Sequence, residues 1–348
     1  MKAIVPINKE KSVPIVITPH KGFIPCMGVL LQSIMENSND KNFYDIIVIH
    51  SEIPADVQEK YEKMFQTKNN FSIRFYNVSD YILRYNFFKK QVSRKSLYIT
   101  TFYRLLIPEL LCNYIKVIYL DADIVVNVDV ASMMDFDISN VMLGAVRDVG
   151  GNGDYYAADG IVKEYRDKVL KLKNPDNYFN AGVLIVNIKA FNEKFSAEQW
   201  WKLIESNNWR SKDQDILNMV CSENTLLLPC TWNYVTTYGE NSAKYMLPED
   251  REERKEVEAK PNIIHYVGNI RPWNYCTTPY FDVFWKYAKK CPFYEEIFNQ
   301  IGEARLIERV IEQSCEGRVN IKSIKNIFVG WMQFQIKKVW SVIKSVNF

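Results

Sequence analysis

Short apolar runs rich in β-branched residues alternate with segments of helical periodicity along the first 120 residues, and this alternation limits the possible folds most strongly. The strand-like runs are at residues 13–18, 45–50, 71–77 and 116–120. The helical segments between them are at residues 25–37, 56–65 and 100–111. Parallel strands joined by right-handed helical crossovers produce this order, so we predict an α/β fold with a mostly parallel central sheet flanked by helices. Ligands of such a sheet gather outside the carboxyl ends of its strands.

The second half of the chain continues the pattern less regularly. We predict strands at residues 181–187 and 262–266 and helices at residues 196–207 and 215–221. The charged run at residues 248–260 is typical of a solvated helix or loop. Without an internal repeat or a low-complexity linker, the sequence predicts one main domain over residues 1–290 and a helical carboxyl-terminal appendage over residues 291–348.

Composition excludes several classes of protein. Of the 348 residues, 47% are hydrophobic and 24% are charged, which is typical of a globular chain and not of a disordered one. The net charge of +3 is too balanced for a dedicated nucleic-acid binder. No run of 18 apolar residues occurs, and the amino terminus lacks the apolar stretch of a signal peptide. Seven scattered cysteines without a Cys-x-x-Cys pair indicate reduced thiols, so we expect a cytoplasmic protein.

Two aspartates follow the strand-like run at residues 116–120. Asp121 and Asp123 stand at positions i and i+2, and in an extended chain both carboxylates project to the same side. Unpaired carboxylates would repel each other, whereas a divalent cation such as Mg²⁺ or Mn²⁺ removes that penalty by binding oxygens from both. The alternative is that both aspartates simply terminate the strand in solvent.

An Asp-x-Asp pair after an apolar strand fits two classes of enzyme. One is the haloacid-dehalogenase-type phosphatases, in which the first aspartate attacks phosphate. The other is the nucleotide-sugar glycosyltransferases of the GT-A fold, in which the pair holds a metal on the donor diphosphate. The phosphatase also needs a second acidic pair after a later strand, and the nearest candidate, residues 152–154, lies in a predicted Gly-rich loop.

The chain has only three histidines, and each can be interpreted separately. His50 ends an apolar strand and is expected to be structural or solvated, whereas His20 follows the first strand and could face a site. His265 is followed by Gly268, which permits close backbone approach, and by the cation Arg271. This arrangement is typical of a phosphate site in which His265 completes the ligands of a metal. A hydrogen-bonded core histidine is the alternative.

Five segments, taken in order, resemble bacterial glycosyltransferase family 8, whose retaining galactosyl- and glucosyltransferases build lipooligosaccharide. They include a Phe-Asn-Ala-Gly strand entry, an Asp-Gln-Asp segment and a His-x-x-Gly-x-x-Arg-Pro-Trp segment. The five lie at residues 100–105, 120–123, 179–187, 213–218 and 265–273. The resemblance covers residues 13–273 and implies the GT-A nucleotide-diphospho-sugar transferase fold, with residues 1–290 as its catalytic domain.

The resemblance also implies roles for individual residues. Asp121, Asp123 and His265 would bind Mn²⁺ or Mg²⁺. Gln214 would lie beneath the anomeric carbon, and Asp148 and Asp213 would, with Asn180, line the transferred sugar and the acceptor approach. The residues implied in donor binding are Thr18, His20, Arg104, Asp121, Ala122, Asp123, Asn180, Ala181, Gly268 and Arg271.

The implied activity is transfer of galactose or glucose from a UDP-sugar to a saccharide acceptor, such as a lipid-linked surface glycan, with retention of configuration. We expect the acceptor hydroxyl to attack from the front face; a carboxylate nucleophile, Asp148 or Asp213, is the alternative. Two positions depart from the family. Residues 20–23 read His-Lys-Gly-Phe where the family often has Asp-x-Asn-Tyr against uracil and ribose, and Arg271 replaces a lysine. The first departure leaves open a sugar-nucleotide-binding paralogue that has lost catalysis.

The carboxyl-terminal segment combines positive charge with amphipathicity. After Glu316 no acidic residue occurs, while lysines recur and Trp331 and Trp340 fall among apolar residues at helical spacing. A basic amphipathic helix with tryptophans is typical of peripheral binding to an anionic membrane. We therefore expect association with the inner face of the cell membrane, with packing of this helix on the catalytic domain as the alternative.

Overall fold

The structure is a computed structural model that describes residues 3–7, 11–93, 99–206 and 209–300. The chain divides into one compact unit of residues 1–272 and 277–294 and a second unit of residues 273–276 and 295–348. The two sheets and the helices that pack on them belong to the first unit. The boundary predicted at residue 290 stays a prediction, because most of the appendage lies outside the described residues.

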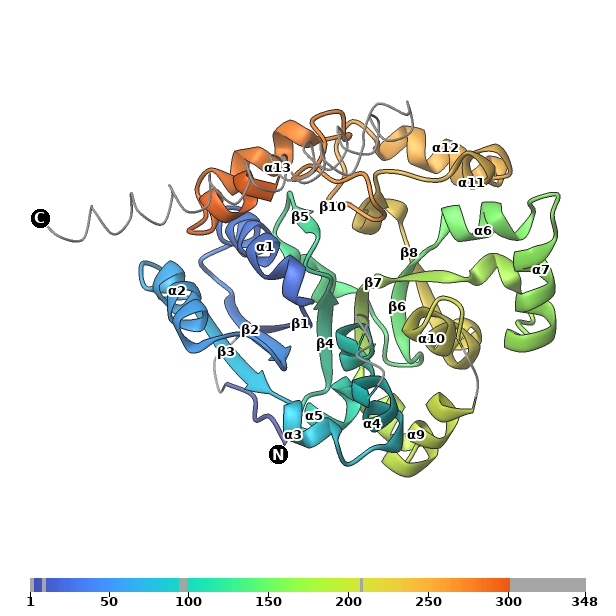
Figure 1. Ribbon diagram of the computed structural model, residues 1–348, viewed down its shortest axis with the longest axis horizontal. Helices are drawn as coiled ribbons and strands as arrows, with labels where there is room; N and C mark the ends of the chain where they lie inside the picture. Colours follow the sequence, from blue (N-terminus) through green and yellow to red (C-terminus); the bar gives the residue numbers. More distant parts are fainter. Residues whose placement is uncertain (1–2, 8–10, 94–98, 207–208, 301–348) are drawn as a thin grey trace, which may run out of the picture. The chain divides into compact units, whose positions relative to one another are not determined.

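A mixed but mostly parallel sheet forms the centre of the first unit (Figure 1). Only β7 runs antiparallel to its neighbours, β4 and β6; the other neighbouring pairs are parallel. The predicted mostly parallel sheet is therefore confirmed. In spatial order its seven strands are β3 (Phe71–Asn77), β2 (Phe43–His50), β1 (Ser12–Ile17), β4 (Lys116–Leu120), β7 (Phe179–Asn187), β6 (Leu143–Arg147) and β8 (Thr225–Leu228).

A second, smaller sheet lies beside the end of β4. Its strands are β5 (Ile124–Val126), β10 (Ile263–His265) and β9 (Tyr234–Val235), with β10 in the middle. The chain leaves the large sheet after β4 and enters the small one at β5, so residues 121–123 cross between the sheets. They form a bend there and not the extended segment that the sequence predicts.

Helices pack around both sheets. The first, α1, has Pro25 in its first turn, a position where the missing N–H is not needed, and it packs against β5 and α13. The helix α10 packs against β7. The α-helices are α1 (Ile24–Asn37), α2 (Ala55–Phe65), α3 (Ser79–Ile82), α4 (Asn86–Ser93), α5 (Ile107–Leu110), α6 (Val149–Tyr155), α7 (Ile161–Tyr165), α8 (Ile188–Lys194), α9 (Ala197–Glu205), α10 (Asp213–Cys221), α11 (Glu240–Lys244), α12 (Pro248–Val257) and α13 (Phe281–Ala288).

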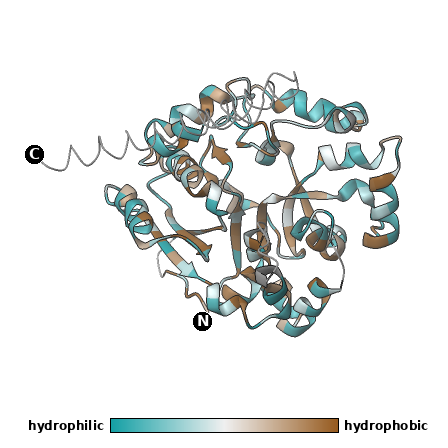
Figure 2. Ribbon diagram, viewed as in Figure 1, coloured by the Kyte–Doolittle hydropathy of each residue, from teal (hydrophilic) through white to brown (hydrophobic). Residues whose placement is uncertain are grey.

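The apolar core follows the strands. Hydrophobic residues concentrate on the strands of the central sheet (Figure 2), and residues 117–120 of β4 are fully buried. Because parallel strands are covered by helices on both faces, they read as continuous apolar runs, which is why they could be predicted. In the part of the chain that the structure describes, no helix combines the length and apolarity needed to cross a membrane.

Residues 100–111 are helical as predicted, with a 3₁₀-helix over Ile99–Leu106 followed by α5. Another local prediction is wrong. Residues 152–154, predicted as a loop, lie in α6, because the Asp148 carboxylate caps that helix through the Gly151 N–H. The charged run is the helix α12.

Candidate active site

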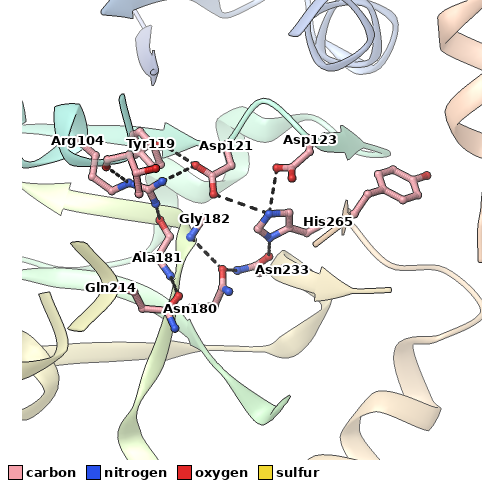
Figure 3. A network of polar contacts seen from close by, with 12 residues as sticks. Arg104, Tyr119, Asp121, Asp123, Asn180, Ala181, Gly182, Gln214, Asn233 and His265 are labelled. Atoms are coloured by element: carbon pink, nitrogen blue, oxygen red, sulfur yellow. Dashed lines mark hydrogen bonds and ion pairs between the residues drawn. The ribbon is translucent and has the colours of Figure 1, made fainter. Parts of the chain in front are cut away.

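Asp121, Asp123 and His265 converge where the two sheets meet (Figure 3). The Nε2 atom of His265 lies 3.8 Å from Asp121 Oδ2 and 3.2 Å from Asp123 Oδ1. One ligand atom from each residue falls within 4.8 Å of the other two. Two carboxylate oxygens and one imidazole nitrogen at these separations fit a divalent cation such as Mn²⁺ or Mg²⁺.

Asn233 fixes the orientation of the His265 imidazole. Its Nδ1 atom lies 2.8 Å from Asn233 Oδ1, an acceptor, so the ring proton is held on Nδ1. The lone pair of Nε2 then faces the two carboxylates. A hydrogen bond from the distal nitrogen is the usual support of a histidine ligand.

Asp121 is held by two donors on its far side. Its Oδ1 atom accepts hydrogen bonds from Arg104 Nη2 and Tyr119 OH, each at 2.7 Å, which leaves Oδ2 facing His265. Burial works against the positive charge of Arg104, but the carboxylates of Asp121 and Asp213 raise the pKa of Arg104. Arg104 therefore orients Asp121, a predicted metal ligand, and it also lines the cavity that opens over this cluster.

Gly182 on β7 leaves the space that this cluster occupies. A Cβ atom at this position would lie 2.3 Å from His265 Cε1 and 2.8 Å from Asp121 Oδ2, closer than non-bonded atoms approach. The Gly182 N–H donates to Asn180 Oδ1, which also accepts from Asn233 Nδ2, each at 2.9 Å. The strand, the small sheet and the cluster are thus joined by one hydrogen-bond network.

Asp213 and Asp123 differ in their electrostatic surroundings. Burial raises the pKa of Asp213 to about 7, opposed by Arg104, whose Nε lies 2.8 Å from its carboxylate. Burial also works against ionisation of Asp123, yet the positive charges of His265, when that ring is protonated, and of Arg271 hold the Asp123 pKa below its usual value. The cluster therefore favours an ionised Asp123 facing the position of the cation.

A cavity of about 590 Å³ opens over the cluster. Arg271 reaches it from the turn after β10, with Nη2 3.5 Å from Asp123 Oδ2. Gly268 does not line it, but with a φ of 91° shapes the turn that presents its neighbours. The predicted site residues that do line it are Thr18, His20, Arg104, Asp121, Ala122, Asp123, Asn180, Ala181, Asp213, Gln214, His265 and Arg271.

Asp148 lies on a second cavity, of about 320 Å³, that adjoins the first. Gln214 lines both: its Oε1 accepts from the Ala181 N–H at 3.1 Å, and its Nε2 donates to Asp148 Oδ2 at 2.8 Å. Asn180 and Ser211 also line both cavities. Gln214 and Asp148, two of the three predicted catalytic residues, therefore meet at the border between the two cavities, whereas Asp213 lines the first cavity and not the second.

The other two histidines differ in position. His20 lines the first cavity, and its Nδ1 accepts from the Gly22 N–H at 3.1 Å. His50 is buried, and its Nδ1 accepts from the Ile53 N–H at 3.2 Å, so its structural role is confirmed.

Sequence reasoning missed Tyr119 and Asn233. Tyr119 is one of several residues in an apolar strand. Its position two residues before Asp121 was the only feature of the sequence that could have indicated its role. Asn233 lies in no segment of the family resemblance, and only the structure brings it to His265.

A family model described as glycosyl transferase family 8 matches residues 14–277. The chain belongs to glycosyl transferase family 8. Curated relatives include glycosyltransferase GlyA of Streptococcus pneumoniae, 29% identical over 78% of this chain, and general stress protein A of Bacillus subtilis, 24% identical over 81% of it. This chain spans 34% of GlyA and 94% of general stress protein A. The lipopolysaccharide 1,2-glucosyltransferase of Escherichia coli is 24% identical over 46% of this chain and 44% of its own.

Solved structures of the family confirm the GT-A fold. The bifunctional glycosyltransferase WbbM matches with a TM-score of 0.75 and 26% identity, over 86% of this chain and 53% of WbbM. The galactosyltransferase LgtC, solved with donor and acceptor sugar analogues, matches with a TM-score of 0.58 and 22% identity, over 80% of this chain and 96% of its own. This family 8 chain thus spans about a third of GlyA and about half of WbbM.

Proposed function

We propose that this protein is a metal-dependent, retaining hexosyltransferase that moves galactose or glucose from a UDP-sugar to a saccharide acceptor. The observation that carries the proposal is the convergence of Asp121, Asp123 and His265 beneath a cavity of about 590 Å³. The names of family members, a lipopolysaccharide glucosyltransferase and a galactosyltransferase, support hexose transfer.

The three ligand side chains would hold Mn²⁺ or Mg²⁺, which when bound neutralises diphosphate charge. Arg271 lies beside Asp123 and carries the second positive charge toward the same space. Its guanidinium would hold the departing diphosphate through charge-assisted hydrogen bonds. Arg104 and Asn233 would keep Asp121 and His265 in their observed orientations.

Two side chains flank the point where the sugar would be transferred. The Gln214 amide is fixed between the Ala181 N–H and Asp148, so it presents a neutral dipole and not a nucleophilic carboxylate. Asp213 is paired with Arg104, and Asp148 accepts from Gly151 and Gln214. These partners support front-face attack by an acceptor hydroxyl, with proton transfer to a diphosphate oxygen, over a carboxylate nucleophile.

The test is release of nucleoside diphosphate from UDP-, GDP- and dTDP-hexoses with and without Mn²⁺. We expect UDP release stimulated by Mn²⁺ and lowered roughly 100-fold or more by Asp123→Asn, because a metal ligand is lost. The matched control is Asp137→Asn, because Asp137 is an exposed aspartate whose Oδ1 accepts a hydrogen bond from the Ser139 N–H. No stimulation by Mn²⁺ with any of the donors would reject the proposal.

Two other functions were open from the sequence. A phosphatase would use Asp121 as nucleophile, but its Oδ1 atom already accepts from Arg104 and Tyr119, and α6 carries no second acidic pair after a strand. A paralogue without catalysis is motivated by His20, which lines the donor cavity where the family often has an aspartate. Beryllofluoride trapping on Asp121 would support the first, and turnover with any acceptor would exclude the second.

We further propose that the acceptor is lipid-linked and that the basic segment after Glu316 binds the inner face of the cell membrane. The support is the sequence alone, since residues 301–348 lie outside the described part of the chain. Truncation after Gly317 should leave a folded protein that no longer binds anionic liposomes. Undiminished liposome binding would show that this segment is not the anchor.

A further inference from the structure

Arg166 is a buried cation in the wall of the second cavity. It follows α7, is 4% exposed, and lines the space together with Asp148. Its Nη1 donates to Asn152 Oδ1 at 3.0 Å, and its guanidinium carbon lies 3.6 Å from the centre of the Tyr178 ring. Among the residues that the structure describes, no carboxylate forms an ion pair with it.

The carboxylates of this cavity already accept other hydrogen bonds. Asp148 accepts from Gly151 and Gln214, and Asp154 accepts from Ser242 Oγ at 2.5 Å. Asp215 accepts from Tyr178 and Tyr165, each at 2.8 Å, and from the Ser211 N–H at 2.6 Å. These charges offset part of the Arg166 charge at a distance, but they leave its remaining N–H groups without a carboxylate.

Burying an arginine without a carboxylate partner costs free energy of folding, unless a bound ligand supplies the missing anion. The space between Arg166 and Asp148 is kept open by Gly151, where a Cβ atom would lie 2.8 Å from Arg166 Nη2 and 2.7 Å from Asp148 Oδ2. Arg210, which is exposed, also lines the cavity and adds a second cation. Three carboxylates line the cavity as well, but they already accept hydrogen bonds from the chain, so the Arg166 guanidinium is the group placed to take an anion on the molecule that enters.

The same cavity is shaped for a saccharide. Tyr165, Tyr178 and Tyr238 line it, and aromatic side chains with hydroxyl groups offer both apolar and polar contacts to a sugar ring. It meets the donor cavity at Gln214 and Asn180, so a ligand here would lie beside the transferred sugar.

We propose that the second cavity binds the acceptor saccharide and that Arg166 recognises a carboxylate or phosphate on that acceptor. The inference rests on the proposed function, because it assigns the acceptor of that reaction. The planar guanidinium suits either anion, since both present two oxygens to its parallel N–H groups. Acceptors would then be uronic-acid or phosphate-substituted saccharides and not neutral hexoses alone.

The experiment compares matched acceptors: a methyl hexoside, the methyl hexuronide and the methyl hexoside 6-phosphate. For the full chain with Mn²⁺ and its donor, we expect kcat/KM for one charged acceptor to exceed that of the neutral one about tenfold or more. Arg166→Gln should remove this ratio and Arg166→Lys should retain part of it. Arg84→Gln, on the cluster around Tyr81 and Glu109, is the control and should keep the full ratio.

Equal use of charged and neutral acceptors by the wild-type protein would overturn the inference, as would an Arg166→Gln variant with the ratio unchanged. Circular dichroism checks the fold of each variant. If Arg166→Gln does not fold, the inference is tested by the ratio of the wild-type protein and by Arg210→Gln, which should lower that ratio. Donor hydrolysis without acceptor tests the proposed function separately. If no transfer occurs, calorimetric binding of the three glycosides to the wild-type chain decides, and failure of the charged ones to bind more tightly contradicts the inference.

Discussion

Around the predicted metal ligands, hydrogen bonds from non-ligand residues set the orientation of each side chain. Asn233 holds the His265 ring, while Arg104 and Tyr119 hold one oxygen of Asp121. Each contact takes up one atom of a side chain and leaves its other polar atom facing the candidate cation position. The affinity for metal should therefore depend on residues that never touch the metal.

Asn233→Ala tests this directly. Loss of the Oδ1 acceptor frees the His265 ring to rotate and to exchange tautomers, so we expect Mn²⁺ to bind about 10–100-fold more weakly. Titration followed by electron paramagnetic resonance measures it. Asn127→Ala is the matched control: Asn127 donates to the Pro261 carbonyl next to the same small sheet, and its loss should leave Mn²⁺ affinity within about threefold. Equal weakening in both variants would contradict the assigned role.

The three residues of the candidate metal site could be selected from the sequence, and the residues that hold them in position could not. Asp121 and Asp123 follow a strand at a spacing with chemical meaning, and His265 precedes a glycine and a cation. Asn233, by contrast, lies 32 residues from His265, and nothing in its neighbourhood indicates this contact. Pairings of this kind depend on which strands become neighbours, which a single sequence does not state.

At the scale of elements, the strand β7 passes close to His265 and Asp121, and Gly182 on this strand makes the close approach possible. Gly182→Ala would put a methyl group 2.3 Å from His265 Cε1. We expect the His265 ring to be displaced and Mn²⁺ binding to be lost, with the fold retained at a cost of about 1–3 kcal/mol. Gly144→Ala on the neighbouring strand β6, where a Cβ atom meets nothing closer than 3.4 Å, is the control and should bind Mn²⁺ normally. Normal binding by Gly182→Ala would contradict the geometry.

The carboxyl end of β2 carries a pH-sensitive contact. Burial lowers the pKa of His50 below its ordinary value, and its Nδ1 must stay unprotonated to accept from Ile53. As pH falls below about 6.5 the unfolded chain takes up the proton more readily than the folded one, so stability falls. His50→Asn keeps an acceptor without titrating, so between about pH 7.5 and about pH 5 its unfolding midpoint should fall less than that of the wild type. An equal fall in both would exclude His50 as a source.

Some elements were predictable and others were not, for physical reasons. The strands β1, β2 and β4 are buried and read as apolar runs, and the edge strand β3 is partly buried and alternates in character, so all four were predicted within two residues. The strands β5 and β9 are only three and two residues long and need the neighbouring β10 to form at all. The helix α6 contains three glycines and forms because of its cap and its packing on α11, which composition does not reveal.

At the scale of the first unit, the site exists because one crossing joins two sheets. The large sheet delivers Asp121 at the end of β4, and the small sheet delivers Asp123 and His265 through β5 and β10. A parallel sheet with ligands at its carboxyl edge could be predicted, but the antiparallel insertion of β7 and the separate small sheet could not. Both depend on pairings between distant segments.

The central claim is that Asp121, Asp123 and His265 hold one divalent cation that binds the donor diphosphate. Calorimetric titration of UDP into the full chain, with Mn²⁺ and with the metal removed by chelation, tests it most directly. We predict that UDP binds with Mn²⁺ and that chelation or Asp123→Asn weakens binding about 100-fold or more. UDP binding of equal affinity in the absence of metal, or undiminished by the Asp123→Asn substitution, would contradict the claim.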